Sequence, residues 1–172
     1  MKKIQDLNIL IDDESGMTPT KLRTKARAAM AQNEIGFIVI DYLGRLSVKG
    51  LEHDLVASTT VISGEIKDMA KELNIPVLVL CQLNRKGAEE KPRLSHLRQS
   101  GSLEQDADIA ILLSRCPNPQ YVTAQVAKQR IGPTGETQMF FEKETQRFLD
   151  IDHRGDPVYP AEYQAELEEE LY

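Results

Sequence analysis

The 172-residue sequence has few cysteines and no long apolar run, and each absence excludes a class of protein. Only Cys81 and Cys116 are present, and two cysteines without secretory context argue against a disulfide framework. The longest apolar runs, such as Phe37–Ile40 and Ile75–Cys81, are far too short to span a bilayer. Met1-Lys2-Lys3 is not followed by an apolar segment, so we expect no signal peptide and no membrane partner. The cytoplasm is the simplest compartment.

Net positive charge is also missing. The 21 Lys and Arg residues against 27 Asp and Glu residues give −6, which taken as a whole argues against a nucleic-acid partner. The imbalance is local, because from Asp150 onward eight acidic residues accompany Arg154 alone. The rest of the chain is close to neutral and can still present a basic loop. We therefore expect one domain over residues 1–149 and an acidic C-terminal tail over residues 150–172, either solvated or docked on a partner through a short amphipathic turn.

Hydrophobic periodicity predicts strands that alternate with helices. Thr18 can cap a helix that has Pro19 at its first position, and a second helix is predicted over Val56–Leu73, ended by Asn74. The predicted strands are Leu7–Ile11, Ile35–Ile40, Val77–Cys81, Ala107–Leu113, Tyr121–Ala127 and Thr137–Phe141. This order predicts an α/β fold with right-handed crossovers, a mostly parallel sheet flanked by helices, and a C-terminal β-hairpin.

Polar side chains follow several of these strands, where open α/β sheets bind their ligands. Asp12-Asp13, Asp41 and Gln82 occupy such positions. Asp41 is suited to hold a magnesium-bound water beside phosphates, although many strands end in Asp because Asp starts a turn. Gln82 is suited to hydrogen-bond a phosphate or an attacking water without carrying charge. The alternative is an amide that satisfies the backbone of a loop.

Two further segments contain candidate phosphate-binding cations. Residues 97–108 (LRQSGSLEQDAD) combine small residues with one Arg, which suits a nucleic-acid backbone, although a solvated loop has the same composition. Lys128 and Arg130 lie two residues apart on one side of a strand, just before the turn at 132–135. From a hairpin tip they could reach across a subunit interface toward a γ-phosphate, whereas an ordinary basic edge strand is the simpler interpretation of this segment alone.

Taken together, the segments form an ordered set of motifs. In chain order they are IDD (11–13), DYL (41–43), QLNR (82–85), LRQSGSLEQDAD (97–108), AKQRIGPTG (127–135) and RF (147–148). This set, from about Leu7 to Phe148, resembles the C-terminal ATPase domain of DnaB-type hexameric replicative DNA helicases. The fourth and fifth motifs are the most specific to that family.

The resemblance implies a RecA-like fold of the P-loop NTPase type and a ring of six subunits. ATP and magnesium would lie between neighbouring subunits, and single-stranded DNA would pass through the central channel. The implied site residues are Asp41 (Walker B acid, which holds Mg²⁺ through water) and Gln82 (phosphate sensor), Arg98, Gln99 and Gly101 on the DNA-facing loop, and Lys128 and Arg130 acting in trans on the neighbour's nucleotide.

The sequence also departs from the family pattern. No Gly-x-x-x-x-Gly-Lys-Ser/Thr motif occurs in it, and the family's P-loop and catalytic glutamate would both precede Met1. Gln99 stands where the family usually has Glu, and Gly64 stands where it usually has Arg. We therefore expect an N-terminally truncated RecA-like domain that neither hydrolyses ATP alone nor binds ATP or Mg²⁺ tightly.

A truncated domain would expose sheet edges and apolar surface. We accordingly expect self-association or binding to another helicase subunit, only weak binding of single-stranded DNA by the chain alone, and a helicase loader or primase as further partners. The alternative to a motor fragment is a non-catalytic module that binds or regulates a helicase ring.

Overall fold

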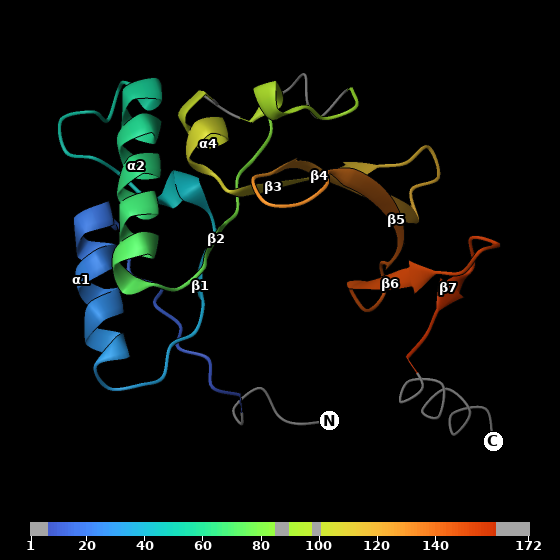
Figure 1. Cartoon of the computed structure of the whole chain (residues 1–172), viewed down its shortest axis with the longest axis horizontal. Coiled ribbons are helices and arrows are strands. Elements are labelled where there is room, and N and C mark those ends of the chain that lie inside the picture. Colours follow the sequence, from blue (N-terminus) through green and yellow to red (C-terminus); the bar gives the residue numbers. More distant parts are fainter. Residues whose placement is uncertain (1–6, 85–89, 98–100, 161–172) are drawn as a thin grey trace. The chain divides into compact units, whose positions relative to one another are not determined.

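The structure, a computed structural model, describes residues 7–84, 90–97 and 101–160 of the chain (Figure 1). The chain divides into two compact units, Met1–Cys81 and Gln82–Tyr172. Each unit has its own β-sheet, with two strands in the first and five in the second. In the ranges that the structure describes, no helix has the length and apolar character needed to cross a membrane.

The first unit is a parallel strand pair with helices. Its elements are α1 (Pro19–Met30), β1 (Ile38–Ile40), the 3-10 helix η2 (Leu43–Arg45), α2 (Leu55–Leu73) and β2 (Val77–Val79). Ile38 lies opposite Val77 and Ile40 opposite Val79. Because β1 and β2 are parallel and joined through α2, they form the βαβ unit that the predicted order of elements requires.

Both helices of this unit begin where the sequence predicts, and α2 also ends there. The hydroxyl of Thr18 accepts a hydrogen bond from the Lys21 N–H at 3.2 Å, and Pro19 occupies the first helical position. The Asp54 carboxylate caps α2, and Asn74 ends it in the left-handed region at φ 53°. The predicted helix boundaries are therefore confirmed to within one residue for α2.

The core of the first unit follows the spacing of α2. Ile62, Ile66 and Met69 recur at helical intervals and are all buried, with Met69 only 1% exposed. Met17 and Leu46, which form an isolated parallel bridge, are also buried. The apolar stripe of one helix and two flanking segments thus supply most of the buried side chains.

The predicted strand Leu7–Ile11 is wrong. These residues form no strand, and their large side chains are exposed, with Ile11 at 85%. A strand is stabilised by hydrogen bonds to a neighbour, and no described strand pairs with this segment. An apolar run alone therefore does not determine a strand. The strands β1 and β2 are also shorter than predicted, because only three pairs of residues face each other.

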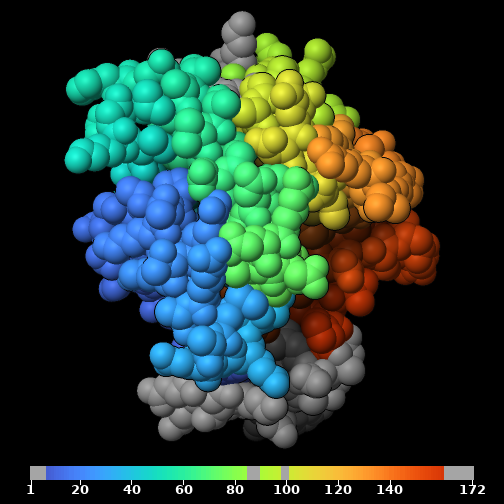
Figure 2. All heavy atoms as spheres, turned by 60° about the vertical axis from the view of Figure 1, so that its left-hand side comes forward, coloured from blue at the N-terminus to red at the C-terminus, as the bar shows by residue number. Residues whose placement is uncertain are grey.

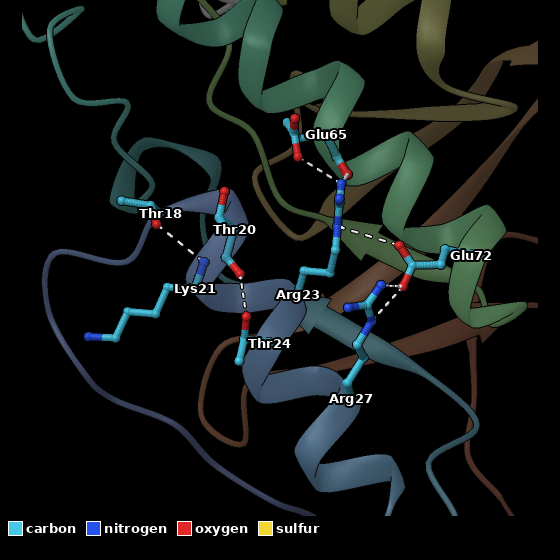
Figure 3. Close-up of polar contacts among 8 residues, drawn as sticks. All are labelled: Thr18, Thr20, Lys21, Arg23, Thr24, Arg27, Glu65 and Glu72. Atoms are coloured by element: carbon cyan, nitrogen blue, oxygen red, sulfur yellow. Dashed lines mark hydrogen bonds and ion pairs between the residues drawn. The ribbon is translucent and has the colours of Figure 1, made fainter.

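Ion pairs join α1 to α2, and those of Arg23 are partly buried (Figure 3). The Arg23 Nη2 donates to the Glu65 carboxylate at 2.7 Å and to the Glu65 carbonyl at 3.2 Å. Arg27 Nε donates to Glu72 at 2.6 Å, and Glu72 also lies 3.8 Å from Arg23 Nε. In the space-filling view the blue atoms of α1 and the teal-to-green atoms of α2 lie in contact (Figure 2). The ion pairs thus reinforce the contact between two helices that pack against each other.

Replacing Arg23 by alanine is expected to lower the free energy of unfolding by about 1–3 kcal/mol, because Glu65 loses two part-buried hydrogen bonds. The matched control is Lys21→Ala, since the Lys21 ammonium pairs with Glu14 alone among the described residues and both side chains are exposed. Such a pair contributes about 1 kcal/mol or less. Urea unfolding of both variants measures the difference. Equal, small losses of unfolding free energy in the two variants would contradict the greater contribution assigned to the Arg23–Glu65 contacts.

The second unit is an antiparallel sheet with one short helix. Its elements are the 3-10 helix η3 (Leu94–His96), α4 (Gly101–Asp106), β3 (Ile109–Arg115), β4 (Tyr121–Gln129), β5 (Gly135–Glu142), β6 (Arg147–Ile151) and β7 (Pro157–Val158). The strands lie in the sheet in chain order. The predicted C-terminal hairpin is confirmed as β4 and β5. The strands β6 and β7 were not predicted, and they include residues of the segment assigned to the acidic tail, whereas residues 161–172 lie outside the described ranges.

The expectation of a mostly parallel sheet needs correction. Among the described residues, only β1 and β2 pair in parallel, and the longer sheet is antiparallel throughout. The connections from β3 to β7 span only four or five residues each. Such connections join antiparallel strands, whereas a parallel pair needs a crossover of about a dozen residues or more. The connection lengths, visible in the sequence, would have given the correct pairing.

Each unit leaves apolar side chains exposed on its sheet. In the first unit the cross-strand pair Val39 and Leu78 is 54% and 45% exposed. In the second unit Ile109, Ile111 and Leu113 occupy alternate positions of β3, and each of these residues is more than half exposed. Leu112, which lies between Ile111 and Leu113, is buried. Parallel sheets normally have both faces covered. The exposed faces therefore mark surfaces suited to another segment or chain.

Candidate functional site

Asp41 lies where the sequence places it, directly after β1. Its carboxylate is exposed, the peptide bond to Tyr42 is cis, and η2 begins two residues later. In the part of the chain that the structure describes, no hydrogen bond or ion pair engages this carboxylate. Nor do the described residues form a group of three or more metal-binding side chains. A single free carboxylate fits Mg²⁺, which keeps several waters and takes one or two protein carboxylates plus phosphates.

Gln82 is the first residue of the second unit and is also exposed. It lines a groove of about 920 Å³ in that unit, together with Arg115 and Gln138. Lys91, also at the groove, pairs with Glu136 at 2.7 Å. Gln82 therefore lines a groove that also has polar donors, on Arg115 and Gln138. Asp41 belongs to the first unit, so the two predicted strand-end residues lie in different units.

Asp12, the other predicted strand-end acid, has a structural partner instead. Its carboxylate accepts a hydrogen bond from Lys25 at 2.5 Å, and that bond holds the pKa of Asp12 below its ordinary value. Glu14 likewise accepts from Lys21 and Lys25, and its pKa is also lowered. These acids are neutralised by lysines of α1. They consequently differ from Asp41, whose carboxylate has no such partner in the ranges that the structure describes.

Lys128 and Arg130 lie on the same side of the hairpin, as predicted. A β-bulge precedes them, since Ala110 pairs with Lys128 while Ile111 pairs with Val126, which leaves Ala127 as the extra residue. Bulges of this kind re-aim the side chains beside them. Lys128 Nζ donates to the Glu104 carbonyl at 2.5 Å and the Gln105 carbonyl at 3.2 Å, and Arg130 Nη2 donates to the same Gln105 carbonyl at 3.1 Å.

The predicted DNA-facing loop is described only at its end. Arg98 and Gln99 lie outside the described residues, whereas Gly101 is the exposed first residue of α4. The carbonyls that receive Lys128 and Arg130 belong to the C-terminal turn of this helix. The structure therefore joins a helix that lies within the 97–108 motif to the cations of the 127–135 motif.

Sequence reasoning missed the partners of these two cations. They are main-chain carbonyls of α4 together with Asp108, whose backbone and side chain both contact Arg130. A sequence does not show which main-chain carbonyls accept hydrogen bonds from side chains. Asp108 was quoted as part of a motif, but only the register of β3 against β4 brings it to Arg130.

Comparisons with known proteins identify the family. A sequence model of the family described as DnaB-like helicase C terminal domain matches residues 1–150, so the chain belongs to that family. The replicative DNA helicase DnaC of Bacillus subtilis (strain 168) is 36% identical over 168 residues, which cover 91% of this chain and 37% of that protein. The replicative DNA helicase DnaB of Pasteurella multocida (strain Pm70) is 36% identical over 160 residues, or 87% of this chain and 34% of that protein.

Solved structures agree on the fold. A DnaB-like replicative helicase, reported with its interactions with primase, superposes with a TM-score of 0.78 at 34% identity, covering 87% of this chain and 38% of that one. A solved ATPase domain superposes with a TM-score of 0.79 at 33% identity, covering 87% of this chain and 57% of that one. The RecA-like α/β fold is thereby confirmed. The chain spans little more than a third of the length of the curated relatives above.

Proposed function

We propose that the chain is the part of a replicative helicase motor domain that supplies a Walker B acid to one nucleotide and two cations to the nucleotide of a neighbouring subunit. The observation that carries the proposal is the arrangement of Lys128 and Arg130. A bulged hairpin strand presents both cations on one side. Both residues lie within the range 1–150 that matches the family. A basic edge strand without such a role needs neither the bulge nor the paired contacts to α4.

In this proposal, Asp41 would hold magnesium through a bound water, since no hydrogen bond or ion pair within the described residues engages its carboxylate. Magnesium, when bound, neutralises charge on the β- and γ-phosphates. The Gln82 amide donates to the γ-phosphate or orients the attacking water, and it does so without changing charge. Lys128 and Arg130 stabilise the charge that develops on the neighbour's γ-phosphate.

The same proposal assigns Arg98, Gln99 and Gly101 to single-stranded DNA in the channel of a ring. A flexible single strand is bound through its phosphates, and each neutralised phosphate contributes about 0.7 to the salt slope of binding. One such loop per subunit offers few contacts, and the net charge of −6 opposes them. Tight binding therefore requires several subunits around one strand. Primase or a loader would be a partner of the assembled ring.

A grafted ring tests the proposal. Residues 7–160 replace the matching segment of the Bacillus subtilis relative, which supplies the remainder of its own chain. We expect the graft to hydrolyse ATP and Asp41→Asn to lower kcat at least about 100-fold, because the water bound to magnesium loses its acceptor. A fluorescent ATP analogue should still bind. Glu34→Gln, which removes another exposed carboxylate of the same unit, is the control. Full activity of Asp41→Asn in assembled rings would contradict the proposal.

The second candidate is a non-catalytic module that binds or regulates a helicase ring. The exposed apolar faces of both units favour it, because an uncovered sheet face is stabilised by association. A motor fragment shares this property. The two functions differ in that only the first depends on Asp41.

The 172-residue chain is expected to associate at low concentration into a dimer or larger species. Burial of a few hundred Å² of apolar surface at about 25 cal/mol per Å² gives several kcal/mol. Replacing Val39 and Leu78 together by lysine should shift the chain toward monomer without disturbing the buried core, because both side chains are about half exposed. Sedimentation velocity measures the mass. A wild-type chain that stays a compact monomer at millimolar concentration would contradict this expectation.

A further inference from the structure

The guanidinium of Arg130 is held along one edge by the segment that leads into β3. Asp108 Oδ1 lies 3.4 Å from Arg130 Nη1, and the Arg130 backbone N–H donates to the Asp108 carbonyl at 2.9 Å. The Gln105 carbonyl accepts from Arg130 Nη2 at 3.1 Å. A guanidinium is planar, so a hydrogen bond at Nη2 together with an ion pair at Nη1 restricts both its position and its plane.

These acceptors lie at the C-terminal end of α4, which already attracts cations. The last carbonyls of a helix lack partners within the helix and carry partial negative charge. Lys128 and Arg130 satisfy two of them, at Glu104 and Gln105. Asp108 adds a full negative charge immediately after the helix. Among the described residues Arg130 consequently has one side-chain ion-pair partner in addition to its main-chain contacts, and only that partner can be changed by mutation.

The contacts leave donors free. Arg130 has five side-chain N–H groups, and the contacts above engage only its two terminal nitrogens. Its side chain is 53% exposed, so further donors face solvent. If every N–H donor of Arg130 were engaged, the side chain could not bind a phosphate. Because the contacts fix the guanidinium and leave other donors accessible, they orient the arginine for binding a phosphate.

We infer that Asp108 is a positioning residue for Arg130: its carboxylate fixes the plane in which the guanidinium meets the neighbouring subunit's γ-phosphate. The inference rests on the proposed function of Arg130. Asp108 itself contacts no nucleotide in this mechanism and acts only through the arginine.

The sign of the effect separates positioning from simple electrostatics. A carboxylate beside Arg130 weakens the local positive potential, so its removal should by charge alone tighten ATP binding and leave or raise the rate. Positioning predicts the opposite, a lower rate at unchanged binding. A misplacement of about 1 Å in a reacting site costs up to about 100-fold in rate. We therefore expect Asp108→Asn in the grafted ring to lower kcat about tenfold, with KM for ATP nearly unchanged.

A double-mutant cycle gives the decisive comparison. If Asp108 acts only through Arg130, Asp108→Asn should cost nothing further in a ring that already carries Arg130→Ala. Glu144→Gln is the matched control, because it removes an exposed carboxylate from the same unit in the turn between β5 and β6. It should leave kcat unchanged. Asp108 is 56% exposed, so its replacement by asparagine is compatible with folding.

A second measurement uses the 172-residue chain directly. The Nη–Hη signals of Arg130, assigned by their loss in Arg130→Ala, should exchange with solvent faster in Asp108→Asn than in wild type, because Asp108 lies beside Nη1. An unchanged exchange rate overturns the inference. So does a wild-type kcat of Asp108→Asn in a ring where Arg130→Ala is impaired, or an equal loss with and without Arg130. A normal rate for Arg130→Ala instead overturns the proposed function, which the other results would leave standing.

Discussion

Replacement of Arg130 by alanine in the grafted ring is expected to lower kcat about 1,000-fold. An arginine that neutralises charge on a γ-phosphate in the transition state contributes 10³–10⁵ to the rate in related phosphoryl-transfer enzymes. The loss should fall mainly on kcat, since the arginine acts on charge that develops during the reaction. Steady-state ATP hydrolysis by rings of confirmed mass gives the comparison.

Two controls make this result specific. Lys143→Ala removes an exposed cation from the turn between β5 and β6 of the same unit and should leave the rate unchanged. Mixing Arg130→Ala subunits with Asp41→Asn subunits should restore hydrolysis, because some interfaces then combine an intact Asp41 with an intact Arg130. Mixed rings without recovered activity would show that the two residues serve the same subunit, contrary to the proposed action in trans.

The 172-residue chain by itself is expected to show no ATP turnover above background, whereas ordinary enzymes work at about 1–10³ s⁻¹. Its sequence contains no Gly-x-x-x-x-Gly-Lys-Ser/Thr segment, so neither a backbone cradle nor its lysine is present to hold the triphosphate. The carboxylate of Asp41 alone supplies no attraction for ATP. Phosphate release from purified chain, with the grafted ring as the positive control, measures this.

The informative comparison is again Asp41→Asn. A slow release of phosphate that is equal in the wild-type chain and in Asp41→Asn comes from a contaminant. Turnover near 1 s⁻¹ that disappears in Asp41→Asn would mean that the chain hydrolyses ATP without the family's phosphate-binding loop, and the truncated-domain expectation would fail.

Local signals predicted the helices well because their determinants lie within a few residues. The Thr18 hydroxyl and Pro19 define the start of α1, and Asn74 with Pro76 defines the end of α2. The hairpin of β4 and β5 was predicted for the same reason, since the turn residues at 132–135 lie between two alternating segments. Each of these features is decided by neighbours in the chain.

Strands depend on partners that are distant in sequence, and here prediction was weaker. Leu7–Ile11 is as apolar as β1, yet it pairs with nothing in the described residues and forms no strand. Conversely, β6 was overlooked although Arg147 to Leu149 pair with β5, and Asp150 and Ile151 pair with β7. Hydrophobicity identifies what could enter a sheet. It does not say which edge is available.

The sequence by itself determined the family, the helices and the identity of the chemical groups: Asp41, Gln82, Lys128 and Arg130 were all named from motifs and their spacing. Only the tertiary structure decided which of them have partners. It left the Asp41 carboxylate free, paired Asp12 with Lys25, and turned Lys128 and Arg130 toward the end of α4. Residue type fixes what a group can donate or accept, whereas strand register and the bulge at Ala127 fix what it meets.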